Sequence, residues 1–171
     1  MHWLEKTSAL LNRGLGWLAG LLLVAMMLLT VLDMVMRSFG RPVAGSYEVI
    51  GWLSAAAMAL ALGYTQLHRG HVSIDLLVAR LRGRVRGSFD VLTSLCALLL
   101  FGAAAAYVAR YGTVLRESGS LSETLKAIVY PWVYVVAAGA AGLTLALLVD
   151  FLRSVHRLVH GSPERHSRGQ A

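Results

Sequence analysis

Histidine is the residue type in this sequence whose spacing could bind a metal ion. His156 and His160 are four residues apart, so a helix would place both imidazole rings on one face. His68 and His71 form a second close pair, and four imidazoles could hold zinc. Histidines also lie partly solvated at membrane surfaces without any metal, and this simpler interpretation accounts for both pairs. We therefore expect no metal ion and no cofactor.

Catalytic chemistry is not indicated by the remaining polar residues. The sequence contains no nucleophile motif, no glycine-rich phosphate loop and no pair of carboxylates placed for acid–base catalysis. We therefore expect no catalytic residue and no enzymatic activity. Most carboxylates lie in loops or at the ends of apolar segments, and these are Asp33, Glu48, Asp75, Asp90, Glu117, Glu123 and Asp150.

Four apolar stretches must position these polar residues, and the stretches themselves contain no Asp, Glu, Lys, Arg or His. They span residues 14–32, 49–67, 91–109 and 127–149. A helix crosses the hydrocarbon layer of a membrane with about 20 apolar residues, so each stretch is long enough. Transporters and pumps usually carry ionisable groups at this depth. An ion path built from charged residues of this chain is therefore not expected.

The composition also indicates a membrane protein. Of the 171 residues, 57% are hydrophobic and 15% are charged, which leaves too few charged side chains to cover a soluble fold and excludes disorder. We predict an all-α integral membrane protein with one four-helix domain over residues 1–160. Its transmembrane helices are expected at about residues 14–36, 48–68, 90–110 and 129–152.

The distribution of Lys and Arg predicts the orientation of these helices. Eleven lie in the terminal segments and the middle loop, against five in the first and third loops. The positive-inside rule then places both termini in the cytoplasm. We attribute the net charge of +7 to loop residues that set this orientation. We expect no binding to nucleic acid, because the sequence carries no recognition motif for it.

An amphipathic segment separates the second and third predicted membrane helices. From Ile74 to Phe89 apolar residues recur at three- and four-residue spacing, which predicts a helix at about residues 73–87 in the cytoplasmic interface. The alternative is that this segment continues a neighbouring membrane helix. Residues 161–171 are polar and are expected to form a mobile cytoplasmic tail. The candidate lipid contacts of the interfacial helix are Arg80, Arg82, Arg84 and Arg86.

Small residues at four-residue spacing predict close helix packing. In lipid, such ridges let two helix backbones approach each other. They could join the four helices to one another or dock a larger membrane partner, and both interpretations stay open. One ridge on the second helix comprises Gly51, Ala55, Ala59 and Gly63; a second, on the fourth, comprises Ala138, Gly142 and Ala146; and Gly16 and Gly20 lie on the first.

The chain resembles a known family around its first two predicted helices. The family has an Arg at the end of the first helix, a turn with Gly and Pro, a Glu at the start of the second, and a Gly-His-Val…Asp pattern at its end. The chain is thereby similar to the small membrane subunit of tripartite ATP-independent periplasmic (TRAP) transporters. The matching residues are Arg37, Gly40, Pro42, Glu48, Gly70, His71, Val72 and Asp75.

The resemblance implies a subunit of a sodium-coupled importer of organic anions such as carboxylates, located in the bacterial inner membrane. A large TRAP membrane subunit would hold the substrate and sodium sites, and a periplasmic substrate-binding protein would dock transiently. The small subunit would be a scaffold for the large one. The rival hypothesis is an autonomous four-helix transporter or channel that works as a homo-oligomer.

Three residues of the family pattern suggest specific contacts. We predict that Arg37 and Glu48 form a charge contact, either with each other or with a partner chain. The alternative is an unpaired Arg37 and a Glu48 that is favoured by the helix dipole. Asp75 has two interpretations as well, a first-turn carboxylate of the interfacial helix or an ion-pair partner of His71. The loops at residues 33–48 and 110–126 are candidates for contact with the binding protein.

Overall fold

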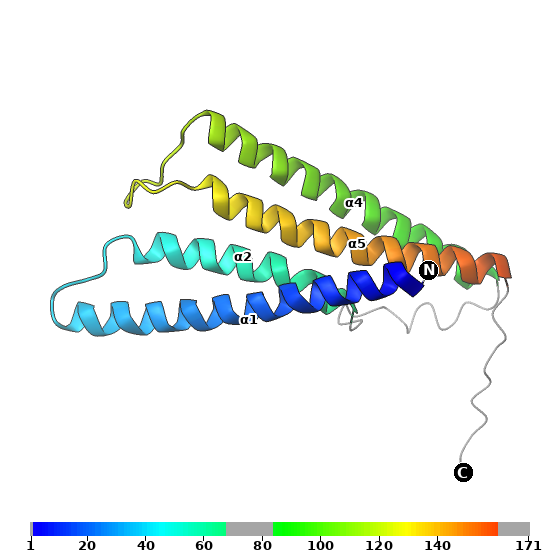
Figure 1. Ribbon diagram of the computed structural model, residues 1–171, viewed down its shortest axis with the longest axis horizontal. Helices are drawn as coiled ribbons and strands as arrows, with labels where there is room; N and C mark the ends of the chain where they lie inside the picture. The colour runs from blue at the N-terminus through cyan, green and yellow to red at the C-terminus, as the bar shows by residue number, and fades with distance from the viewer. Residues whose placement is uncertain (1, 68–83, 161–171) are drawn as a thin grey trace, which may run out of the picture.

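Four long helices make up the described part of the computed structural model, which covers residues 2–67 and 84–160. They are α1 (His2–Ser38), α2 (Ser46–Leu67), α4 (Arg84–Glu117) and α5 (Tyr130–His160), shown in Figure 1. Each is long and apolar enough to cross a membrane. The prediction of four helices long and apolar enough to span a membrane, in an all-helical fold, is confirmed for the described residues.

The helices extend beyond the predicted bounds. Residues before 14 belong to α1, and residues after 110 and after 152 belong to α4 and α5. A charge-free stretch marks the part of a helix that lies in hydrocarbon, but the backbone hydrogen bonds continue into the polar layer wherever no breaker intervenes. Of the predicted interfacial helix, residues 84–87 lie in α4, and the rest, like the predicted tail, lies outside the described residues.

The four helices are arranged as a row in which α2 and α5 are central. α1 packs on α2, α2 on α5, and α5 on α4, while α1 also touches α5 (Figure 1). The core lies between the two central helices, where Leu60 and Leu143 are buried. Most apolar side chains of α1 and α4 point outward. The chain therefore consists of two helical hairpins, α1–α2 and α4–α5, docked through α2 and α5.

The predicted ridge on α2 is buried along half of its length. Ala59 and Gly63 are buried, whereas Gly51 and Ala55 face outward. The closest backbone approach on α5 occurs at Gly139, where an added Cβ would lie 2.5 Å from the carbonyl of Ala59. Gly142 and Ala146 of the predicted α5 ridge are buried, but Ala138 is exposed. The close approach to α2 is thus made by Gly139, which was not part of the predicted ridge, and not by Ala138.

Short loops close the two hairpins at the same end of the row (Figure 1). In the first loop, Gly40 and Gly45 both have a φ of 74°, which glycine adopts without strain. The second loop forms a small turn of its own. Leu121 and Ile128 make an isolated antiparallel bridge, and the Ser122 amide donates to the Ala127 carbonyl at 2.9 Å. Both loops are thereby ordered by local contacts.

Candidate functional site

A buried asparagine joins α1 to α5. The Nδ2 group of Asn12 donates to the Gly142 carbonyl oxygen at 3.1 Å and to the Ser8 carbonyl at 3.0 Å. Ser8 and Asn12 both have 0% exposure. A side-chain hydrogen bond between helices in an apolar environment fixes their mutual register, because the polar group loses its partner if either helix slides. We call Asn12, with its hydrogen bonds to Ser8 and Gly142, the asparagine pin.

The other end of the Asn12 amide lies against α2. Its Oδ1 atom is buried and accepts no conventional hydrogen bond. It occupies the place where a Cβ of Gly63 would stand, and an added Cβ at Gly142 would lie 2.9 Å from it. Such contacts are consistent with weak Cα–H···O hydrogen bonds from glycine. The absence of side chains at Gly63 and Gly142 is what admits Asn12 between the three helices.

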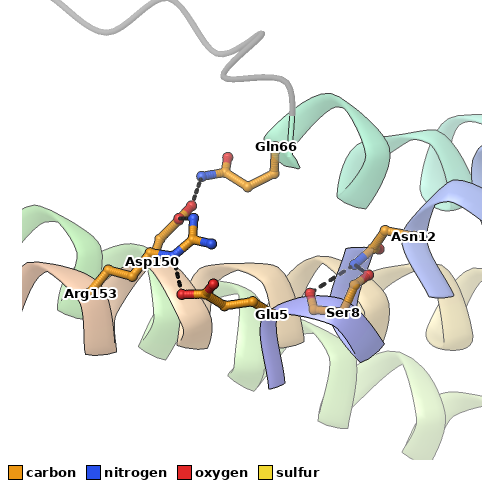
Figure 2. A network of polar contacts seen from close by, with 6 residues as sticks. All are labelled: Glu5, Ser8, Asn12, Gln66, Asp150 and Arg153. Carbon is orange, nitrogen blue, oxygen red and sulfur yellow. Dashed lines mark hydrogen bonds and ion pairs between the residues drawn. The ribbon is translucent and has the colours of Figure 1, made fainter. Parts of the chain in front are cut away.

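A charged network links the same three helices near the N-terminus of α1 (Figure 2). Arg153 on α5 donates from Nε to Glu5 Oε1 on α1 at 2.8 Å. Its Nη1 atom lies 3.8 Å from Asp150 Oδ1. Gln66 on α2 donates to Asp150 at 2.9 Å. The side chains of Arg153 and Glu5 are 43% and 32% exposed, so the pair contributes about 1 kcal/mol at most. Its role is to orient the helix ends.

At the opposite end of the row, Asp33 organises the loop after α1. Its carboxylate accepts from the Arg37 guanidinium and from the Val43 amide, both at 2.9 Å. Asp33 is buried, whereas Arg37 is exposed and lies 5.5 Å from the centre of the Tyr47 ring. The carboxylate thus connects the last turn of α1 with the backbone that leads into α2.

Glu48 connects this region to the second loop. Its carboxylate accepts from the backbone amides of Thr124 and Leu125 at 2.8 and 3.2 Å. The Leu125 side chain packs against Gly45 so closely that a Cβ there would overlap it. The first turn of α2 therefore anchors the loop between α4 and α5, 76 residues away.

These polar groups lie at the two ends of an apolar row of helices, and they contact one another instead of lining a path through it. The sequence also matches, over residues 26–157, the model of the family described as tripartite ATP-independent periplasmic transporters, DctQ component. The chain belongs to the DctQ family. Comparison with curated proteins and with solved structures found no match. A DctQ component is part of a tripartite transporter and is not an enzyme, so this multi-pass membrane protein is the small membrane component of such a system.

The predicted contact residues of this DctQ component lie in different surroundings. Arg37 and Glu48 each have a partner within the chain, but the partners are different, Asp33 and the second loop. Of the α2 ridge, Ala59 and Gly63 are enclosed by other helices, and Gly51 and Ala55 remain on the surface. Arg84 and Arg86 lie in the first turn of α4. The predicted sites His71, Asp75, Arg80 and Arg82 are outside the described residues.

The asparagine pin and the charged network were missing from the sequence-based prediction. Both use the first half of α1, which precedes the family match at residues 26–157. The prediction began this helix at about residue 14, because Arg13 is the last charged residue before the charge-free stretch. The i, i+4 pair of Ser8 and Asn12 was a usable signal, since such pairs share one face of a helix. Gly63 and Gly142, the neighbours of Asn12 on α2 and α5, belong to the predicted ridges of small residues, but no sequence pattern pairs them with Asn12.

Proposed function

We propose that this chain braces the large membrane subunit of a sodium-coupled TRAP importer of organic anions in the bacterial inner membrane. The observation that carries the proposal is that ionisable groups of the chain contact other groups of the same chain. In the described ranges, Asp33, Glu48, Asp150 and Arg153 all contact other groups of the chain at the helix ends. Asp150 and Arg153 join helices to one another, and Asp33 and Glu48 hold the two hairpin loops. Substrate and sodium binding would therefore belong to the large subunit.

The outer helices support the same role. α4 packs mainly on α5, and residues such as Leu99, Leu100 and Tyr107 are 64–71% exposed. On α1, Trp17 and Leu21 are similarly exposed. A membrane protein of this size thus presents two long apolar flanks, suited to lipid and to the helices of a larger partner.

The arrangement also supports termini in the cytoplasm. The start of α1 and the end of α5 lie at the same end of the row, opposite both hairpin loops (Figure 1). The excess of Lys and Arg on the terminal side would place that end in the cytoplasm. The loops held by Asp33 and Glu48 would then face the periplasm, within reach of a substrate-binding protein.

The scaffold hypothesis is tested by purification and reconstitution. We expect the tagged chain to be isolated in mild detergent with a larger membrane protein in a fixed ratio. Liposomes should take up an organic acid only when both membrane proteins, the binding protein and a sodium gradient are present. Uptake by liposomes that contain this chain alone would refute the scaffold role and support the homo-oligomeric alternative.

The orientation is tested separately with reporters fused after Ala171. Alkaline phosphatase, which is active in the periplasm, should be inactive at this position, and green fluorescent protein should fluoresce. A fusion at Gly40, in the loop between α1 and α2, serves as the matched control and should show the reverse pattern. Phosphatase activity at Ala171 would contradict the proposed topology.

A further inference from the structure

A polar cavity of about 350 Å³ opens between α1, α2 and α5 at the end that holds the charged network. This volume lies at the lower end of the range for small-molecule sites, roughly 300–1,000 Å³. Side chains of all three helices contribute to its wall, and they include charged, amide and hydroxyl groups. The residues that the argument uses are Glu5, Ser8, Arg13, Gln66, Asp150 and Arg153.

Each of the three helices indicates the level of the cavity relative to the membrane. Arg13 directly precedes the charge-free stretch of α1, Leu67 ends that of α2, and Asp150 directly follows that of α5. All three residues line the cavity. Since each stretch is long enough to span the hydrocarbon layer, their shared boundary corresponds to the level of the lipid headgroups. A ligand at this level meets the membrane surface directly.

The charged side chains of the cavity wall differ in whether they form ion pairs. Arg153 is held by Glu5 and Asp150. Arg13 is exposed, and the contacts found among residues 2–67 and 84–160 include no ion pair for it. Among the lining residues that the structure describes, two arginines face two carboxylates, so positive and negative groups are equal in number there. The wall therefore suits a ligand that carries both signs, with its anionic group at Arg13.

We propose that this cavity binds the headgroup of a zwitterionic phospholipid with a primary ammonium group, as in phosphatidylethanolamine. The guanidinium of Arg13 binds the phosphate, a pairing for which its planar donors are suited. The ammonium group lies toward the carboxylates of Glu5 and Asp150, where it can donate hydrogen bonds that a quaternary ammonium cannot. The bound lipid fills the gap between α1 and the two central helices.

The proposal is tested by native mass spectrometry of the full-length chain released from nanodiscs. The nanodiscs contain phosphatidylcholine, phosphatidylethanolamine and phosphatidylglycerol, and the last two are present in equal amounts. We expect the ethanolamine lipid to be retained in preference to the other two. Arg13→Gln should reduce its retention about tenfold, the loss expected for one charge-assisted hydrogen bond. Arg110→Gln, an exposed arginine on α4, is the matched control and should retain lipid like the wild type.

Two further measurements distinguish lipid binding in this cavity from general association of lipid with the protein. Ala9→Phe should reduce retention at least as much as Arg13→Gln, because it fills the cavity without changing its charge. Soluble glycerophosphoethanolamine should compete with the lipid, whereas inorganic phosphate should not. Equal lipid retention by Arg13→Gln and the wild type would overturn the proposal. Preferred retention of phosphatidylglycerol, or full competition by inorganic phosphate, would overturn the assignment of a zwitterionic headgroup.

Discussion

Asn12 and Gly142 are 130 positions apart in the sequence and are joined by a hydrogen bond of 3.1 Å between α1 and α5. The donor is a side-chain amide and the acceptor is a backbone carbonyl, so the contact depends on the placement of both helices. Because α2 contributes Gly63 to the same point, one residue reports on the packing of three helices. Substitutions here separate polar from steric contributions to the stability of the bundle.

Gly63→Ala should destabilise the protein by about 1–3 kcal/mol, the usual cost of overpacking a tight contact. The added methyl group would collide with the Asn12 amide. The free energy of unfolding in mixed detergent micelles, followed by circular dichroism, measures the effect. Gly51→Ala is the matched control on the same helix, since no described residue beyond its chain neighbours and the backbone of its own turn lies within 4 Å of its Cβ position. Equal stabilities of the two variants would contradict the packing described for Asn12.

Asn12→Ala should lower the free energy of unfolding by about 0.5–2 kcal/mol, the range for a hydrogen bond between membrane helices. Thr30→Ala on α1 is the control, because its hydroxyl bonds within its own helix and is exposed. We also expect Gly63→Ala to cost less in the Asn12→Ala background, where the methyl group no longer meets the amide. Strict additivity of the two changes would show that the residues do not interact.

Glu48→Gln should loosen the loop between α4 and α5. A carboxylate accepts from both amides, whereas the glutamine amide has one acceptor oxygen for Thr124 and Leu125. We expect hydrogen exchange at these two amides to accelerate about tenfold. Glu123→Gln, an exposed change in the same loop, should have no such effect.

The same Glu48 variant tests whether this contact matters for transport. If the loop docks partner chains, its loosening should reduce both the recovery of the large membrane protein and the uptake rate. Unchanged assembly and unchanged uptake in Glu48→Gln would limit the role of Glu48 to local structure.

Asp33→Ala should destabilise the chain more than Asp33→Asn. Alanine loses both the Arg37 ion pair and the acceptor for the Val43 amide, whereas asparagine keeps an acceptor oxygen. We expect losses of about 1–3 kcal/mol for alanine, measured by unfolding in mixed micelles. Arg41→Gln, an exposed charge change in the same loop, is the control. Equal losses for the two Asp33 variants would show that the hydrogen bond to the Val43 amide adds little to the contribution of the charge, and a larger loss for asparagine would contradict the role given to this acceptor.

The positions of the four helices could be predicted because hydrocarbon excludes charged groups from long stretches of sequence. The ends of the helices could not, because a helix continues without penalty into the polar layer. This is why α1 begins at His2 and places Asn12 inside the bundle. The ion pair of Asp33 and Arg37 was accessible from their i, i+4 spacing. The predicted alternatives for Arg37 were instead a contact with Glu48, a contact with a partner chain, or no partner.

Spacing also predicts a ridge of small residues but not the direction in which it faces. Ala59 and Gly63 are buried, and Gly51 lies outside, because packed helices cross at an angle and share only part of their length. The contact of Glu48 with Thr124 depends on the fold of a distant loop, which no local pattern encodes. Tertiary partners of this kind follow from the docking of the two hairpins.

The docking of two hairpins through α2 and α5 also has a consequence for biosynthesis. The ribosome completes α1 and α2 before α4 and α5 emerge, and each hairpin pairs neighbours in the chain. The hydrogen bond from Asn12 to Gly142 can form only after α5 has been inserted, and those that Glu48 accepts from Thr124 and Leu125 only after the loop that follows α4 has been made. Membrane insertion and assembly are thus separate steps, and quality control of the nascent chain would act between them.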